Sequence, residues 1–202
     1  MRESGWKSIE DTYDRMLRLV GSESFLRMEG LGNEVPFFIC PHPASEIVRV
    51  ADMQKQLENS LSKQGIQVLT VDLYDLAIEI LKEEDDLEYF LEQEEALPKD
   101  KLREDLQSIL DVETVLVPAI SRKMDAEEFD VLFLSGVGEV FPYVRSHNVL
   151  NNLQKAAKTR PTVMFFPGTY THSLETGASL DLFGKLHDDK YYRAFNVFYC
   201  EA

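Results

Sequence analysis

The stretch Pro161-Thr-Val-Met-Phe-Phe-Pro-Gly-Thr-Tyr170 decides the fold class of this chain. Five β-prone residues, Thr162–Phe166, run without interruption into a Pro-Gly pair. A continuous apolar run bounded by turn residues is typical of a strand that is buried on both faces of a sheet. We therefore expect a central strand at Thr162–Phe166 and an exposed loop at Pro167–His172.

Four other runs of the same kind alternate with segments of helical spacing. Strands are expected at Val35–Cys40, Gln67–Val71, Val131–Leu134 and Ala194–Tyr199. Helices are expected at Ser8–Glu29, Ser45–Gly65, Leu76–Lys123 and Tyr143–Lys158. This alternation predicts a three-layer α/β domain with a mainly parallel sheet of about five strands. All 202 residues are expected in one domain, with an N-terminal helical segment at 1–33 and an acidic helical insert at 76–123, between the second and third strands.

The composition excludes several classes of protein. No apolar run approaches the roughly 20 residues of a membrane helix, and the N-terminus has no signal-peptide pattern. With two cysteines only, Cys40 and Cys200, we expect a cytoplasmic protein without disulfides. The net charge of −15 (21 basic against 36 acidic residues) and the lack of a basic patch argue against direct binding of nucleic acid.

The predicted architecture is like that of P-loop nucleotide-binding domains, but the phosphate-binding motif is absent. Pro41-His-Pro43 stands where a glycine-rich loop would follow the first strand, and prolines lack the N–H groups that hold a phosphate. Gly136-Val-Gly138 does not continue as GxGxxG, because Phe141 occupies the third glycine position. Any nucleotide site would have to be of another kind.

Ligands of parallel α/β sheets bind beyond the carboxyl ends of the strands. Those ends would bring together our candidate ligand-binding residues: His42, Asp72, Asp75, Gly136, Gly138, Glu139, Pro167, Gly168, Thr169 and His172. A cluster of His42 and His172 with Asp72 or Asp75 is the one acid–base or metal arrangement that the sequence offers. Packing and turn formation explain the same residues, and we expect no catalytic residue, resident metal or cofactor.

Two further features have both a structural and a functional interpretation. Cys40 and His42 can share one side of a strand, but strand geometry does not aim them at each other, so a buried structural cysteine is expected. The segment Glu79–Glu113 holds 14 acidic and 4 basic residues. Its run Glu83–Glu95 is either a solvated helix face or a docking surface for a basic protein.

Several stretches resemble the BrxB family of bacteriophage-exclusion (BREX) systems. They are Gln67–Leu76, Asp130–Pro142, Pro161–Tyr170, Leu182–His187 and Tyr192–Val197, within a similarity from about Val35 to Tyr199. The chain differs from the family pattern at Ser135–Gly138 and in the acidic insert. The resemblance carries no catalytic residue over to this sequence.

The resemblance implies a cytoplasmic component of a bacterial phage-defence system. Its partners would be other BREX proteins: an alkaline-phosphatase-like protein (PglZ), an adenine-specific methyltransferase (PglX) and a large ATPase. Together with the lack of a catalytic constellation, this favours a non-enzymatic adaptor that binds chiefly PglZ. The alternative is a ligand sensor or enzyme, nucleotide- or metal-dependent, at the carboxyl edge of the sheet.

Overall fold

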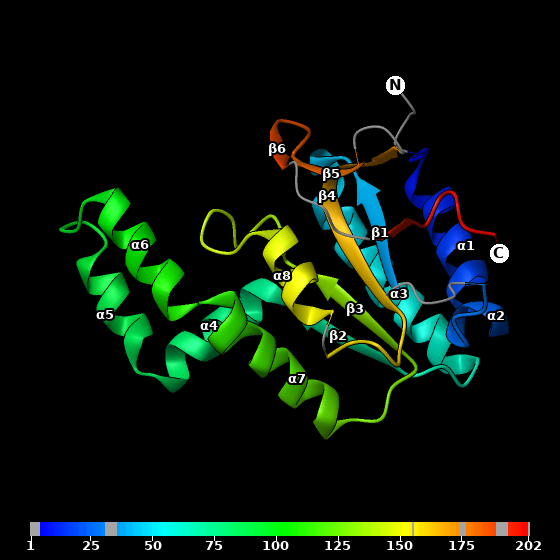
Figure 1. Ribbon diagram of the computed structural model, residues 1–202, viewed down its shortest axis with the longest axis horizontal. Helices are drawn as coiled ribbons and strands as arrows, with labels where there is room; N and C mark the ends of the chain where they lie inside the picture. Colours follow the sequence, from blue (N-terminus) through cyan, green and yellow to red (C-terminus); the bar gives the residue numbers. More distant parts are fainter. Residues whose placement is uncertain (1–4, 31–35, 155, 174–176, 189–193, 202) are drawn as a thin grey trace.

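A five-stranded parallel sheet forms the centre of the computed structural model (Figure 1), which describes residues 5–30, 36–154, 156–173, 177–188 and 194–201. The strand order is β2–β3–β4–β1–β7. Every neighbouring pair in that order is parallel. The strands are β1 (Phe37–His42), β2 (Val68–Asp72), β3 (Val131–Ser135), β4 (Thr162–Ser173) and β7 (Phe195–Asn196).

Helices cover both faces of this sheet. One face packs against α1 (Ile9–Val20), α2 (Glu23–Leu26) and α3 (Ile47–Lys63), and the other against α4 (Leu73–Glu83), α7 (Val117–Ala126) and α8 (Ser146–Leu153). The expected three-layer α/β fold is therefore confirmed. No helix in the described part of the chain is both long and apolar enough to cross a bilayer.

The strand residues alternate between two hydrophobic cores. Met164 and Phe166 lie in the core beneath α4, α7 and α8, while Val163 and Phe165 lie in the core beneath α1 and α3. Successive side chains of a strand point to opposite faces, so an uninterrupted apolar run fills both cores at once. The central position expected for Thr162–Phe166 is confirmed, since β4 pairs with β3 on one side and β1 on the other.

The expected loop at Pro167–His172 is wrong, because β4 continues as a strand to Ser173. Pro167 still pairs with His42 of β1, whereas the residues from Gly168 onward pair antiparallel with β5 (Gly177–Leu182). The short strand β6 (Leu186–Asp188) then pairs with β5. Neither β5 nor β6 was expected, and together with the outer half of β4 they form an antiparallel ribbon.

The helix boundaries also differ from the expectation. The helix expected over Ser8–Glu29 is two helices. The first, α1, ends at Val20 with Gly21 as its C-cap, and the Ser22 hydroxyl caps α2 by accepting from the Phe25 backbone N–H at 3.3 Å. Ser45 does not cap α3, since it lies within a 3-10 turn, Ala44–Glu46. The helix expected at Tyr143–Lys158 is the shorter α8, and the last strand is reduced to the two residues of β7.

The acidic insert is helical, as expected. Between α4 and α7 it contains α5 (Asp86–Gln93), α6 (Lys99–Ile109) and a π-helical turn, Val112–Leu116. We call α5 and α6 the arm, because in Figure 1 they extend away from the sheet. Phe90 is the buried residue of α5, and α6 has none. Leu87 of α5 and Leu102, Leu106 and Ile109 of α6 are partly buried and pack against the core. The arm therefore joins the core mainly through partly buried side chains.

Candidate functional site

The carboxyl edge of the sheet brings Asp72 next to the loop after β3. One carboxylate oxygen of Asp72 accepts from the backbone N–H groups of Tyr74 (2.9 Å) and Asp75 (3.1 Å), which caps α4. The other oxygen accepts from the Ser135 hydroxyl at 2.8 Å. These three hydrogen bonds use both carboxylate oxygens of Asp72 and connect β2, α4 and β3. The carboxylate therefore has a structural role.

The glycines of this edge are required by close packing. A Cβ atom on Gly136, whose φ is +72°, would lie 2.4 Å from an oxygen of Asp72. A Cβ atom on Gly168 would lie 2.2 Å from the backbone oxygen of Asp181 in β5. Gly138 is less tightly packed, since a Cβ atom there would lie 3.0 Å from Phe183 and 3.1 Å from Pro167. These glycines admit neighbouring chain segments at the positions where a phosphate cradle would keep open space.

Thr169 lies on the antiparallel part of β4, opposite Asp181 of β5. Its hydroxyl is 3.4 Å from one carboxylate oxygen of Asp181, and the Ser179 hydroxyl donates to the other oxygen at 3.0 Å. Tyr170, which is buried, donates from its hydroxyl to the backbone oxygen of Ala194 at 2.6 Å. The polar groups of this segment therefore hold the ribbon and the chain before β7 together.

Cys40 and His42 lie at the end of β1 and are both buried. Burial raises the pKa of the Cys40 thiol to about 12 and lowers the pKa of His42 to about 4. The Nδ1 atom of His42 is 3.1 Å from the backbone oxygen of Pro43, and its ring lies 6.2 Å from the ring of Trp6. The expected burial of Cys40 is confirmed, and a thiol with so high a pKa is a poor nucleophile.

The remaining candidates at this edge do not form the expected cluster. Pro167 is paired with His42, but His172 lies five residues farther along β4 and is paired with Ala178. At about 3.3 Å per strand residue, the two histidine backbones are separated by roughly 16 Å along the strand direction. Asp75 and Glu139 are exposed. Among the residues that the structure describes, no three or more His, Cys, Asp or Glu side chains are placed to hold a metal ion.

Three of the arginines that could have contributed to a nucleic-acid surface have partners within the chain. Arg15 donates from Nε to the backbone oxygen of Val197 at 3.0 Å and also to that of Cys200. Arg160 donates from Nε to the backbone oxygen of Phe129 at 2.8 Å. Arg27 is paired with Glu23. Lys155, five residues before Arg160, lies outside the described residues.

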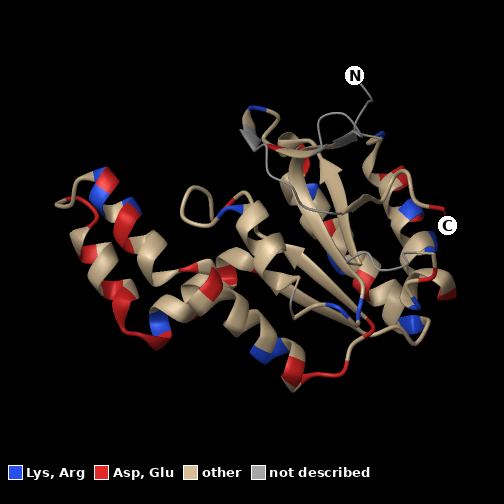
Figure 2. Cartoon of the chain, in the orientation of Figure 1, with Lys and Arg blue, Asp and Glu red and all other residues tan. Residues whose placement is uncertain are grey.

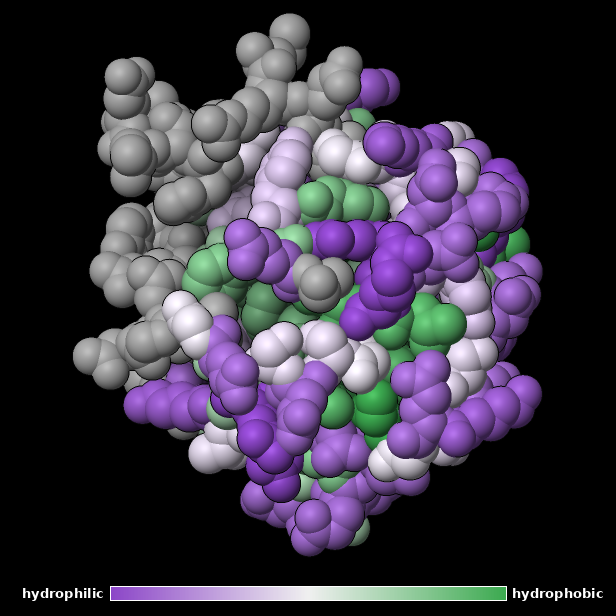
Figure 3. All heavy atoms as spheres, turned by 90° about the vertical axis from the view of Figure 1, so that its right-hand side faces the viewer, coloured by the Kyte–Doolittle hydropathy of each residue, from purple (hydrophilic) through white to green (hydrophobic). Residues whose placement is uncertain are grey.

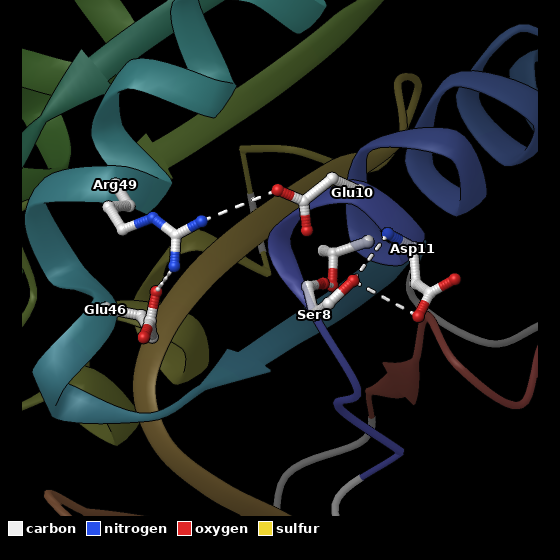
Figure 4. A network of polar contacts seen from close by, with 6 residues as sticks. Ser8, Glu10, Asp11, Glu46 and Arg49 are labelled. Carbon is white, nitrogen blue, oxygen red and sulfur yellow. Dashed lines mark hydrogen bonds and ion pairs between the residues drawn. The ribbon is translucent and has the colours of Figure 1, made fainter.

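A cleft lies between α1 and α3, on the face shown in Figure 3, where apolar side chains form a strip between polar ones. Its volume is about 450 Å³. Figure 4 shows that Arg49 joins the two helices through ion pairs with Glu10 (3.5 Å) and Glu46 (2.9 Å), while Ser8 caps α1 by accepting from the Asp11 backbone N–H at 3.0 Å. The arginine at this cleft is therefore already neutralised.

The acidic face of the arm is the remaining candidate surface. Figure 2 shows acidic residues along α5 and residues of both charges along α6. The α6 cations Lys101 and Arg103 are paired with carboxylates of the same helix, at 2.6 Å and 3.1 Å. None of the α5 carboxylates has a cation within ion-pair distance among the described residues.

Leu91 is exposed in the middle of these carboxylates. Leu91 is 64% exposed. Residues three apart share a helix face, which puts Glu88 beside Leu91, and Glu94, the C-cap residue of α5, follows three residues after it. The arm thus presents an aliphatic side chain within an acidic surface that is not neutralised.

Comparison with known proteins identifies the family. The family model for the BREX protein BrxB matches residues 69–197. A BREX protein BrxB of Bacillus cereus (strain H3081.97) is 36% identical over 198 residues, which cover 95% of this chain and 98% of that protein. This chain belongs to the BrxB family. A second BrxB, from Escherichia coli O9:H4 (strain HS), is 29% identical over 178 residues, 88% of this chain and 86% of that protein. No solved structure matches.

Within this BrxB-family chain, the sequence pattern missed two features of the surface. Leu91 fits the helical spacing of core residues, although it is exposed. Its acidic neighbours in the sequence were the signal that could have indicated an exposed position. The ribbon was missed because Pro167-Gly168 is typical of a turn. The alternation of Ala178, Leu180 and Leu182 with polar residues was the signal for β5.

Substitution of Asp72 tests whether this carboxylate at the sheet edge of the BrxB-family chain stabilises the fold. We expect Asp72→Ala to lower the free energy of unfolding by about 1–2 kcal/mol, because α4 loses its cap and Ser135 loses an acceptor. Asp75→Ala, at an exposed carboxylate one turn away, is the matched control and should change stability by less than about 0.5 kcal/mol. Urea unfolding measures both, and equal stability of the two variants would contradict the capping role.

Proposed function

We propose that this chain is a non-enzymatic adaptor of a BREX phage-defence system, and that its arm docks on a basic surface of another BREX protein. Membership of the BrxB family supports the setting in phage defence. The exposed Leu91 among unpaired carboxylates of α5 is the observation that carries the docking role. The PglZ-type protein is the first partner to test.

The arm has the two properties that a docking surface uses. An apolar side chain that becomes buried on association supplies binding energy at the centre of an interface. Surrounding charges of one sign attract a partner of the opposite sign and speed the encounter, with an effect that salt weakens. The carboxylates of the sheet edge, by contrast, are either held by the fold, as Asp72 is, or exposed singly, as Asp75 and Glu139 are.

Leu91 provides the sharpest test of the adaptor role. We expect Leu91→Asp to weaken binding to the PglZ-type partner at least tenfold, because the partner would have to desolvate a carboxylate in place of an aliphatic side chain. Val48→Asp is the matched control, since Val48 is 75% exposed on α3, away from the arm. Titration calorimetry of the purified proteins measures the two dissociation constants.

The same measurement decides the proposal. Binding by wild type should weaken as salt rises, because the α5 carboxylates are exposed to counterions. Equal loss in the Leu91→Asp and Val48→Asp variants would show that the arm is not the contact surface. Failure of the wild-type chain to bind any BREX protein at low salt would contradict the adaptor role itself.

A further inference from the structure

A small apolar cleft lies between the ribbon and the chain that leads into α8. Its volume is about 230 Å³. Phe141 forms one wall, and Leu180, Leu182 and Leu186 of β5 and β6 form the other. Leu186 is 41% exposed, so an apolar surface at this cleft is in contact with water. The cleft is separate from the arm and from the carboxyl ends of β2 and β3.

Two cations stand at the rim of this cleft, although the chain as a whole carries a net charge of −15. They are Arg145, just before α8, and Lys185, in the turn between β5 and β6; both are exposed. In the part of the chain that the structure describes, neither has a carboxylate within 4.0 Å. Arg145 also lines a neighbouring cleft with Asp111 and Glu113, but neither carboxylate reaches ion-pair distance.

Ser146 adds a hydroxyl donor to the lining of the cleft. The residue is 9% exposed, and its hydroxyl forms no hydrogen bond with another described side chain or backbone group. It is also the first residue of α8, and Arg145 supplies no side-chain cap to that helix. The first backbone N–H groups of a helix favour an anion, so the helix end and the hydroxyl act in the same direction as the two cations.

We propose that this cleft binds the carboxyl-terminal residue of a partner protein whose last side chain is apolar. The apolar walls take the side chain, and the terminal carboxylate lies between Arg145, Lys185 and the Ser146 hydroxyl. Capture of a chain end in this way is an established mode of peptide recognition. The cleft is smaller than the roughly 300–1,000 Å³ of small-molecule sites, and its leucines offer nothing to inorganic phosphate.

This site goes beyond the adaptor role, and it binds a ligand of the opposite charge to the one proposed for the arm. The arm would take a basic surface, whereas the cleft takes a negatively charged chain end. The test uses the isolated full-length chain and a short peptide, so its outcome is independent of whether any BREX protein binds the arm. The two proposals can therefore fail separately.

The probe is the peptide acetyl-Gly-Ser-Gly-Leu with a free carboxyl terminus, titrated into the labelled chain and followed by NMR. We expect saturable shifts at Arg145, Ser146 and Lys185, and at least tenfold weaker binding of the same peptide with a carboxyl-terminal amide. Equal binding of acid and amide would overturn the proposal. If the small acid 3-phenylpropionate binds as tightly as the peptide, the occupant is a free carboxylate and the partner chain end is excluded.

Variants locate the site. Lys185→Gln and Arg145→Gln are each expected to weaken the peptide about tenfold, and Ser146→Ala to weaken it less. Lys82→Gln is the matched control, because Lys82 is an exposed cation of α4 outside this cleft. Melting temperatures establish that each variant is folded. Unchanged binding in both Lys185→Gln and Arg145→Gln would overturn the assignment.

Discussion

Replacement of Phe166 by alanine is expected to lower the free energy of unfolding by about 3–5 kcal/mol. Phe166 is fully buried in the central strand β4, in the core beneath α4, α7 and α8. Its ring also lies against Gly168, where a Cβ atom would come within 2.8 Å of Cε1. Removal of the ring leaves a cavity that the two neighbouring strands, β1 and β3, prevent from collapsing.

The size of this effect makes it easy to measure. Domains are stable by about 5–15 kcal/mol, so Phe166→Ala removes a large part of the total. Urea unfolding gives the difference, and the control is Tyr89→Ala, at an aromatic side chain that is 51% exposed on the arm. We expect the control to stay within about 1 kcal/mol of wild type. Near-wild-type stability of Phe166→Ala would contradict the central place of β4.

Acidification below pH 6.5 is expected to destabilise the fold through His42. Burial lowers the pKa of this histidine from 6.5 to about 4, against the opposing effects of the Pro43 backbone oxygen and the charge of Glu46. Above pH 6.5 the ring is neutral in both the folded and unfolded chain, so its contribution does not change. Between pH 6.5 and 4 the unfolded chain binds a proton that the folded chain does not.

The corresponding loss of stability approaches about 1.4 kcal/mol per pH unit within that window, and levels off below pH 4. Carboxylates titrate in the same range, so the comparison is with His42→Asn, whose amide N–H can still donate to the Pro43 oxygen. Urea unfolding at pH 7.5, 6.5 and 5.5 should show a smaller pH dependence in the variant. Parallel pH profiles would show that His42 is not the titrating group.

The parallel sheet was predictable because its strands are buried on both faces. Val131–Leu134 and Thr162–Phe166 each supply residues to both cores, so their apolar runs have no gaps. The path of the chain after Phe166 was not predictable from local signals. Pro167-Gly168 is typical of a turn, but pairing with a strand farther along the chain keeps this segment extended.

The candidate site was predictable only in part, because local sequence signals do not show which distant segments pair with each other. The order of strands and loops predicted that Asp72 and Gly136 would meet, and they do. The cleft with Arg145 and Lys185 depends on where the ribbon folds back, and no local pattern contains that information. The acidic character of the arm is visible in composition, whereas the exposure of Leu91 requires knowledge of which helix faces the core.

The arm has a consequence for how this family can evolve. It leaves the sheet after β2 and returns before β3, and these two strands pair directly with each other whatever lies between them. Substitutions at the exposed positions of α5 and α6, which do not pack against the core, cost little stability. The charge and length of the arm can therefore change while the sheet and its strand pairing stay the same.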